Sequence, residues 1–222
     1  LFKFTQQNKI PMTFRAAGTS LSGQAVTDGI LVDISKYWDK YSIEDDPKHI
    51  RFQPGLVGGF LNNALKPHRR RIGPDPASID ACMMGGILAN NSSGMCCGVT
   101  ENSYRTIHSM TFVLPNGFVL DTADPKANQI FENEQPHIAK GLLELKQRIV
   151  NSTSQYKGET LAKKINRRYQ MKNNNGYLLN AFLDFDTPLD ILAHLLIGSE
   201  GTLGFIAEAV LHTLPDYTYK YT

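Results

Sequence analysis

A run of mostly small residues, uncharged except for one arginine, extends from Phe14 to Ala25 with the sequence FRAAGTSLSGQA. It follows residues 11–14, which are typical of a β-strand, and residues 29–34 after it are typical of another. Small side chains let the backbone turn sharply and bring its N–H groups close to a ligand, and hydroxyl groups add donors. Converging N–H dipoles suit a diphosphate. A tight turn between two strands would have a similar composition, so that alternative stays open.

The same residues exclude two common phosphate-binding loops. The Gly-x-x-x-x-Gly-Lys-Ser/Thr pattern of nucleoside triphosphate loops is absent, and Gly18 and Gly23 do not form a Gly-x-Gly-x-x-Gly sequence. The Rossmann pattern also requires a helix after the loop, whereas a strand is expected here. The loop therefore indicates a nucleotide-binding fold of another kind.

Composition narrows the class of protein. The 222 residues carry a net charge of +2 and are 41% hydrophobic, which argues against disorder and against a nucleic-acid partner. No apolar run approaches the roughly 20 residues that span a bilayer, so we expect no transmembrane segment. We expect a cytoplasmic location, with peripheral membrane attachment of the full-length protein left open. The chain does not begin with Met, and we expect it to be a piece of a larger protein.

Cysteines and histidines bear on disulfides and metals. Cys82, Cys96 and Cys97 cannot all pair, which favours a reducing compartment. The six histidines occur singly along the chain, without the spacing of a metal motif, so we predict no metal site. They are residues 49, 68, 108, 137, 194 and 212.

The order of expected elements indicates an α+β protein. A helix end precedes the first strand, an apolar period of 3.6 predicts a helix near residues 56–65, and Pro115-Asn116-Gly117 predicts a hairpin. Asp186 and Thr187 before Pro188 predict a helix start. Further strands are expected at residues 49–53 and 204–214, and helices at 136–150, 159–168 and 188–196.

Two other segments share the small-residue character of the first loop. Residues 85–94 read GGILANNSSG, and residues 197–206 carry three glycines before the last expected strand. Residues 74–78, PDPAS, form a rigid polar turn. Each segment has an ordinary alternative, either a glycine-rich turn or a helix C-cap. Three such segments in a chain of this size favour a large, extended cofactor.

Six motifs in order carry a resemblance to a known family. They are residues 15–23, 74–78, 85–86, 91–94, 172–180 and 198–204. Together they resemble the FAD-binding domain of the vanillyl-alcohol oxidase / p-cresol methylhydroxylase (PCMH-type) flavoprotein family. They look most like its D-2-hydroxyacid dehydrogenase branch, which includes D-lactate dehydrogenases, the glycolate oxidase FAD subunit and D-2-hydroxyglutarate dehydrogenase. Residues 93–99 and the insert resemble large members that fuse this domain to an iron–sulfur domain.

The resemblance implies a fold of two α+β lobes with FAD between them. The first lobe would comprise residues 1–54, truncated at its N-terminus, and the second residues 55–222, with a helical insert near 124–170. The substrate cap and the iron–sulfur domain are not expected within this chain. A catalytic base is expected in the cap, so its identity is unknown, and this chain alone is expected not to turn over substrate.

The resemblance also implies which residues hold the cofactor. The first loop would bind the diphosphate, and residues near 75 would contact the diphosphate and ribityl parts. Residues near 85 would line the ribityl and isoalloxazine parts, and residues near 204 would contact the adenosine. Thr19 stands where relatives with a covalently attached flavin often carry His, which implies non-covalent FAD. Lys172 is a candidate for the pyrimidine edge, although it is equally typical of a surface. The implied cofactor-binding residues are Arg15, Ala16, Ala17, Gly18, Thr19, Ser20, Leu21, Ser22, Pro74, Asp75, Ser78, Gly85, Gly86, Asn91, Gly94, Glu200, Gly204 and Ile206.

The implied activity is oxidation of a small D-2-hydroxyacid, such as D-lactate, glycolate or D-2-hydroxyglutarate, by hydride transfer to flavin N5. The electron acceptor is not implied, a homo-oligomer is compatible with the sequence, and an iron–sulfur cluster would belong to the full-length protein. One alternative is a non-catalytic flavin- or nucleotide-binding module. Another is a different family member, such as an alkyl-dihydroxyacetone-phosphate synthase or a sugar oxidase.

Overall fold

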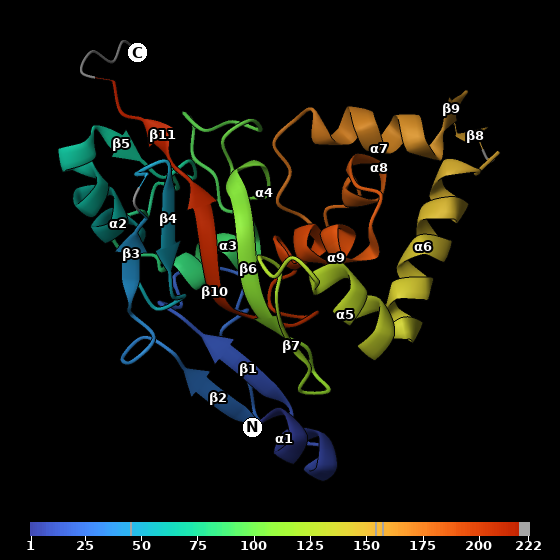
Figure 1. The fold of residues 1–222 in the computed structure, drawn as a ribbon, viewed down its shortest axis with the longest axis horizontal. Coiled ribbons are helices and arrows are strands. Elements are labelled where there is room, and N and C mark those ends of the chain that lie inside the picture. Colours follow the sequence, from blue (N-terminus) through green and yellow to red (C-terminus); the bar gives the residue numbers. More distant parts are fainter. Residues whose placement is uncertain (45, 154, 157, 218–222) are drawn as a thin grey trace.

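The computed structural model describes residues 1–44, 46–153, 155–156 and 158–217. A small parallel sheet stands at the N-terminal end of the molecule (Figure 1). Its two strands are paired from Met12 with Ile30 to Arg15 with Asp33, and the loop of interest connects them. The elements are α1 (Phe2–Asn8), β1 (Met12–Arg15) and β2 (Ile30–Asp33).

A five-stranded antiparallel sheet forms the centre of the fold, in the order β3-β4-β10-β6-β7. The long strand β10 runs beside β4 on one side and β6 on the other. Along β4, Ile50 and Phe52 are buried whereas His49 and Arg51 are only half-buried, so one face of the sheet carries the core. The strands are β3 (Tyr41–Ile43), β4 (His49–Phe52), β6 (Ile107–Val113), β7 (Val119–Asp121) and β10 (Phe205–His212).

Helices complete one continuous core with this sheet. Leu61 of α2, Leu88 of α3 and Leu196 of α9 are fully buried together with Phe52 and Phe112 of the strands. Burial of large apolar side chains is the main favourable term that holds these layers together. The helices are α2 (Gly58–Leu65), α3 (Met84–Asn90), α4 (Ser103–Thr106) and α9 (Pro188–Leu196).

The expected helical insert is present beside α9 (Figure 1). Its longest helix spans Pro136–Val150, the range that periodicity predicts. Lys146 from this helix donates to the carbonyl of Phe185 at 2.6 Å and to Asp186 at 2.7 Å, which ties the insert to the segment before α9. The elements are α5 (Ala127–Glu134), α6 (Pro136–Val150), β8 (Gln155–Tyr156), β9 (Glu159–Thr160), α7 (Leu161–Tyr169) and α8 (Ala181–Asp184).

The α+β class is confirmed, and the predicted hairpin, the N-cap at Thr187 and the last long strand are present. A short 3-10 helix η1 (Lys66–His68) leads to β5 (Arg70–Arg71), which pairs with β11 (Leu214–Pro215). Among the helices in the described ranges, none combines the length and apolarity needed to cross a bilayer.

The chain passes from the parallel sheet to the five-stranded sheet between β2 and β3, because β3 and β4 hydrogen-bond within the five-stranded sheet. Residues 85–90, for which a glycine-rich turn was one expectation, belong to helix α3. That helix ends at Asn91, whose φ of 50° is the left-handed cap conformation that Asn tolerates.

Candidate functional site

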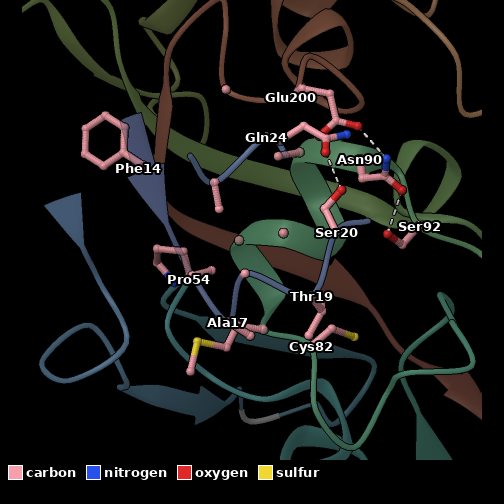
Figure 2. A pocket seen from close by; sticks show the side chains of 18 of the residues that line it. Phe14, Ala17, Thr19, Ser20, Gln24, Pro54, Cys82, Asn90, Ser92 and Glu200 are labelled. Carbon is pink, nitrogen blue, oxygen red and sulfur yellow. Dashed lines mark hydrogen bonds between the residues drawn. The ribbon is translucent and has the colours of Figure 1, made fainter. Parts of the chain in front are cut away.

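A pocket of about 360 Å³ lies where the two sheets meet. Three chain segments supply most of its lining: the loop after β1, helix α3 with the residues before it, and the turn that leads into β10. Figure 2 shows Thr19 and Ser20 on one of these segments, facing Cys82 and Asn90 on another. The segments that share small-residue composition therefore converge in space.

The loop after β1 presents a series of unpaired backbone donors. Pairing of β1 with β2 ends where Ile34 donates to the carbonyl of Arg15 at 3.0 Å. Gly18 and Gly23 then adopt φ values of 67° and 78°, a conformation that favours glycine. Within the described chain, the amides from residue 17 to residue 25 donate no hydrogen bond to another protein group. These donors are available to a ligand.

Arg15 places a positive charge at the start of this loop. A Cβ on Gly18 would come within 2.7 Å of Arg15 Nε, so the guanidinium lies directly against the backbone of Gly18. Further along, the hydroxyl of Ser20 donates to Gln24 Oε1 across the turn. A cation beside free amide donors makes the loop electrostatically suited to an anion.

Two glycines shape the second wall of the pocket, on helix α3. The amide of Gly85 donates to the carbonyl of Pro54 at 2.8 Å, and a Cβ at Gly85 would lie 2.8 Å from the Pro54 ring. This close approach requires glycine. Gly86 differs, because a Cβ there would meet nothing within 4 Å. Gly86 is exposed and lines the pocket, so it leaves a flat, open surface on the helix.

The third wall is anchored to the C-terminal end of α3. Gly198 donates to the carbonyl of Leu88 at 3.0 Å, and Glu200 donates to that of Ala89 at 2.8 Å. The Glu200 side chain accepts from Asn90 Nδ2, and Ser92 donates to Asn90 Oδ1 at 2.9 Å. This network fixes a row of polar groups along one side of the pocket (Figure 2).

Aromatic rings close the pocket where the sheets meet. Phe14 of β1 stacks on Phe205 of β10, with ring centroids 4.2 Å apart and an interplanar angle of 19°. Trp38 packs against Phe205 in a T-shaped arrangement, with ring centroids 4.9 Å apart. Phe14 and Phe205 both line the pocket, which therefore joins a polar wall to an apolar one.

The structure brings twelve of the eighteen predicted cofactor residues to this pocket. Those that line it are Ala16, Ala17, Gly18, Thr19, Ser20, Leu21, Ser78, Gly85, Gly86, Glu200, Gly204 and Ile206. Those that do not are Arg15, Ser22, Pro74, Asp75, Asn91 and Gly94. Arg15 nevertheless contacts Gly18.

Asp75 has a structural role behind the pocket. Its carboxylate accepts from the amides of Gly94 at 2.8 Å, Cys96 at 3.0 Å and Cys97 at 3.2 Å. Burial alone would raise the pKa of Asp75, but a hydrogen bond from the Cys97 side chain, together with those from the three amides, outweighs it and lowers the pKa. A Cβ on Gly94 would meet the Asp75 carbonyl at 1.9 Å, so glycine is required there.

The Asn91 side chain also serves the framework, because its Oδ1 accepts from the amide of Tyr104 at 3.1 Å. Lys172, expected at a flavin edge, donates to the carbonyl of Ser93. That contact lies next to Ser92, which lines the pocket, but Lys172 itself does not line it.

Several lining residues were not predicted from the sequence. Phe14, Gln24, Asn90 and Phe205 are the most informative, because they are large or polar. Gln24 lies inside the small-residue run and could have been found there. Phe205 and Phe14 read simply as strand residues, since only the pairing of the two sheets brings their rings together.

The loop and the segments opposite it can be compared with known proteins. Residues 1–123 match the family model described as "FAD binding domain". The chain belongs to this FAD-binding domain family. The match includes the first loop and helix α3, two of the three walls of the pocket.

Relatives with curated names extend the similarity beyond the family model. D-2-hydroxyglutarate dehydrogenase of Haemophilus influenzae is 30% identical over 224 residues, which cover 98% of this chain and 21% of that protein. Glycolate oxidase subunit GlcD of Escherichia coli is 32% identical over 108 residues, 46% of this chain and 22% of that protein. D-lactate dehydrogenase [cytochrome] 1, mitochondrial, of Saccharomyces cerevisiae is 26% identical, covering 95% of this chain and 27% of that protein.

The chain thus spans about a fifth of the length of the D-2-hydroxyglutarate dehydrogenases that it matches. Among solved structures, alkyldihydroxyacetonephosphate synthase superposes with TM-scores of 0.56 and 0.57 in two crystal forms. The sequence identity is 18%, and the match covers 97% of this chain and 29% of the synthase chain. This similarity shows a shared fold.

Proposed function

We propose that the pocket between the two sheets binds FAD without a covalent bond, with the diphosphate on the loop from Arg15 to Ala25. One observation carries the proposal: a run of amide donors without protein partners, next to the Arg15 guanidinium, lines a pocket in a chain of the FAD-binding domain family. A diphosphate offers several acceptor oxygens and negative charge, which match these groups.

The other walls suit the remaining parts of the cofactor. Gly86 presents bare helix backbone, so a flat ring system can approach it without meeting a side chain. Across the pocket, the Asn90–Glu200 pair offers amide and carboxylate groups that can bond to ring nitrogens or sugar hydroxyls. Phe14 and Phe205 supply apolar surface.

Bound FAD would supply the hydride acceptor that the oxidation requires. The residues of this chain would hold the cofactor and exclude water from one side of it. In this role Arg15 offsets negative charge, and Asp75 acts indirectly, by fixing the loop from Gly94 to Cys97. The catalytic base, an iron–sulfur cluster and the electron acceptor are assigned to other parts of the protein.

We further propose that the whole protein oxidises a D-2-hydroxyacid. Support comes from the names of the relatives, which are D-2-hydroxyglutarate, glycolate and D-lactate enzymes. D-2-hydroxyglutarate is our first choice, because the dehydrogenases of that name match 90–98% of this chain at 29–30% identity.

The test of FAD binding is the absorbance spectrum of the purified protein with added FAD. A shifted, structured flavin band with a saturable titration is expected, whereas a spectrum identical to free FAD contradicts the proposal. Acid denaturation then separates the two modes of attachment. Because Thr19 offers no imidazole, all flavin should appear in the supernatant; flavin retained in the precipitate would contradict non-covalent binding.

The test of activity is dye-linked oxidation of D-2-hydroxyglutarate, D-lactate and glycolate by the FAD-loaded full-length protein, because the catalytic base is assigned outside the residues of this chain. Reduction of the dye with one D-hydroxyacid, and not with its L-enantiomer where it has one, supports the proposal. FAD binding without turnover of any of the three would favour a non-catalytic flavin module or another substrate class.

A further inference from the structure

Three histidines that are far apart in the sequence lie together on the five-stranded sheet. His49 is on β4, His108 on β6 and His212 on β10, and β10 lies between the other two strands. Their ligand-type nitrogens all lie within 4.8 Å of one another. The sequence-based expectation of no metal site rested on the dispersal of histidines along the chain, and the fold removes that basis.

Strand register produces the cluster. His49 is the direct cross-strand partner of His212. On the other side, Leu211 pairs with Ile107, and a register shift at this point of β10 brings His108 beside His212. The three ring centroids are 4.5 to 4.8 Å apart. Each imidazole is therefore held by a different strand of one sheet, which fixes their relative positions.

The distances approach those of a metal site. His49 Nε2 and His212 Nδ1 are 3.0 Å apart. Two imidazole nitrogens bound to one tetrahedral Zn²⁺, with bonds of about 2.0–2.1 Å, are separated by about 3.4 Å. His108 and His212 are exposed, so rotation of their side chains can bring the third nitrogen to the ion.

The surrounding charges favour a cation. On the same side of the sheet, Arg51 is paired with Glu208 at 2.6 Å and with Glu44 at 3.4 Å. The two carboxylates outweigh the one guanidinium, so this group contributes net negative charge.

We propose that His49, His108 and His212 form a binding site for a divalent transition metal, with Zn²⁺ as the ion tested. Three neutral imidazoles are a preferred donor set for this class of metal, and they leave a fourth position for water or another donor. The ion would link β4, β10 and β6, the three central strands of the sheet, at the end where His212 lies.

This site stands apart from the pocket. Phe205 begins β10 at the pocket, whereas His212 ends it. At about 3.3 Å per residue, the two positions are roughly 23 Å apart. The inference therefore does not depend on the proposed FAD binding, and FAD affinity serves as an independent check on each variant.

The experiment is a Zn²⁺ titration of the protein by calorimetry, with bound metal counted after dialysis. The variants are His108→Ala and His212→Ala, and His137→Ala is the matched control, because His137 is an exposed histidine on α6. We expect each of the first two variants to retain one equivalent of Zn²⁺ fewer than the control after dialysis. In calorimetry, their affinity for this Zn²⁺ should be at least about tenfold lower. Thermal unfolding should show a Zn²⁺-dependent rise in Tm for the wild type and the control only.

A circular dichroism spectrum and FAD affinity like those of the wild type establish that a variant is folded. His108→Gln is a second variant at the same exposed position, in case His108→Ala is not folded. Equal Zn²⁺ binding by the wild type and both cluster variants would overturn the proposal. A wild-type protein that binds no Zn²⁺ in the titration would overturn it as well.

Discussion

The ring of Phe14 lies stacked on the ring of Phe205, 4.2 Å away, and this contact joins the small parallel sheet to the five-stranded sheet. Both residues line the pocket, and Phe2 adds a further ring contact to Phe14 at 5.7 Å. A contact that connects two sheets beside a ligand pocket should affect both stability and binding.

Phe14→Ala should lower the free energy of unfolding by about 2 kcal/mol. This is less than the loss expected from the same substitution at a fully buried Phe, because Phe14 is half-buried. FAD affinity should fall as well, since the loop after β1 loses its support. Denaturant unfolding and FAD titration measure the two effects. Phe4→Ala, at an exposed position on α1, is the control and should change neither quantity appreciably. An unchanged FAD affinity in Phe14→Ala would contradict the proposed role of this contact.

Gly86→Leu should abolish FAD binding while leaving the fold intact. The new side chain meets no protein atom within 4 Å of its Cβ and extends into the pocket. Replacing a helical glycine should also stabilise the helix by about 0.5–1 kcal/mol. Absorbance titration with FAD and thermal unfolding separate the two effects.

Gly141→Leu is the matched control for Gly86→Leu. Gly141 lies on α6, and a Cβ there also meets nothing within 4 Å, but it is not part of the pocket. This variant should retain the wild-type FAD affinity. Wild-type affinity in Gly86→Leu as well would show that FAD does not bind against α3.

Asp75→Asn should destabilise the fold by about 2 kcal/mol, because a carboxylate that accepts from three backbone amides becomes a neutral amide. The lowered pKa of Asp75 means that the unfolded chain binds its proton more readily as pH falls below about 4. The wild type should therefore lose this stabilisation as pH falls through the folded-state pKa, and Asp75→Asn should show a shallower acid dependence. Asp28→Asn, an exposed change of the same type, should leave both quantities unchanged.

His194 should make stability depend on pH near neutrality. Burial lowers its pKa, with Arg105 adding to the effect and Asp190 and Asp184 opposing it. Below about pH 6.5 the unfolded chain therefore binds more protons than the folded chain. The free energy of unfolding decreases as the pH is lowered, until the folded-state pKa is reached. In the wild type, the His194 ring stacks on Phe185 with centroids 3.7 Å apart. His194→Phe should keep this stack and weaken the dependence of stability on pH.

Denaturant unfolding at pH 7.5 and 5.5 measures the His194 effect. His108 and His212 also have lowered pKa values and the same sign, so His194→Phe should remove only part of the pH dependence. His137→Phe is the exposed control. A pH dependence in His194→Phe equal to that of the wild type would contradict the assignment.

Local patterns in the sequence predicted most of the elements, because periodicity, the turn at residues 115–117 and the cap at Thr187 act over a few residues. They also predicted the first loop and the turn at Glu200. The glycines of these two segments either have positive φ values or pack closely against neighbouring atoms. In contrast, the sheet that contains β3 and β4 depends on pairing with β10, more than 150 residues away, which no local pattern reports.

The candidate site shows the same division. The small-residue segments could be identified from composition, but their distances from a ligand could not. Asp75 and Gly94, which the sequence places at the cofactor, contact each other and do not line the pocket, and no local pattern reports this contact. The histidine cluster arises only from strand register, so isolated histidines in the sequence gave no indication of it.

A crystal structure of the protein with FAD would locate the cofactor directly. We expect density for the diphosphate against the loop after β1, with phosphate oxygens within hydrogen-bond distance of amides between Ala17 and Ala25 and the Arg15 guanidinium nearby. FAD bound with its diphosphate away from this loop, or no FAD in the pocket at saturating concentration, would contradict this expectation.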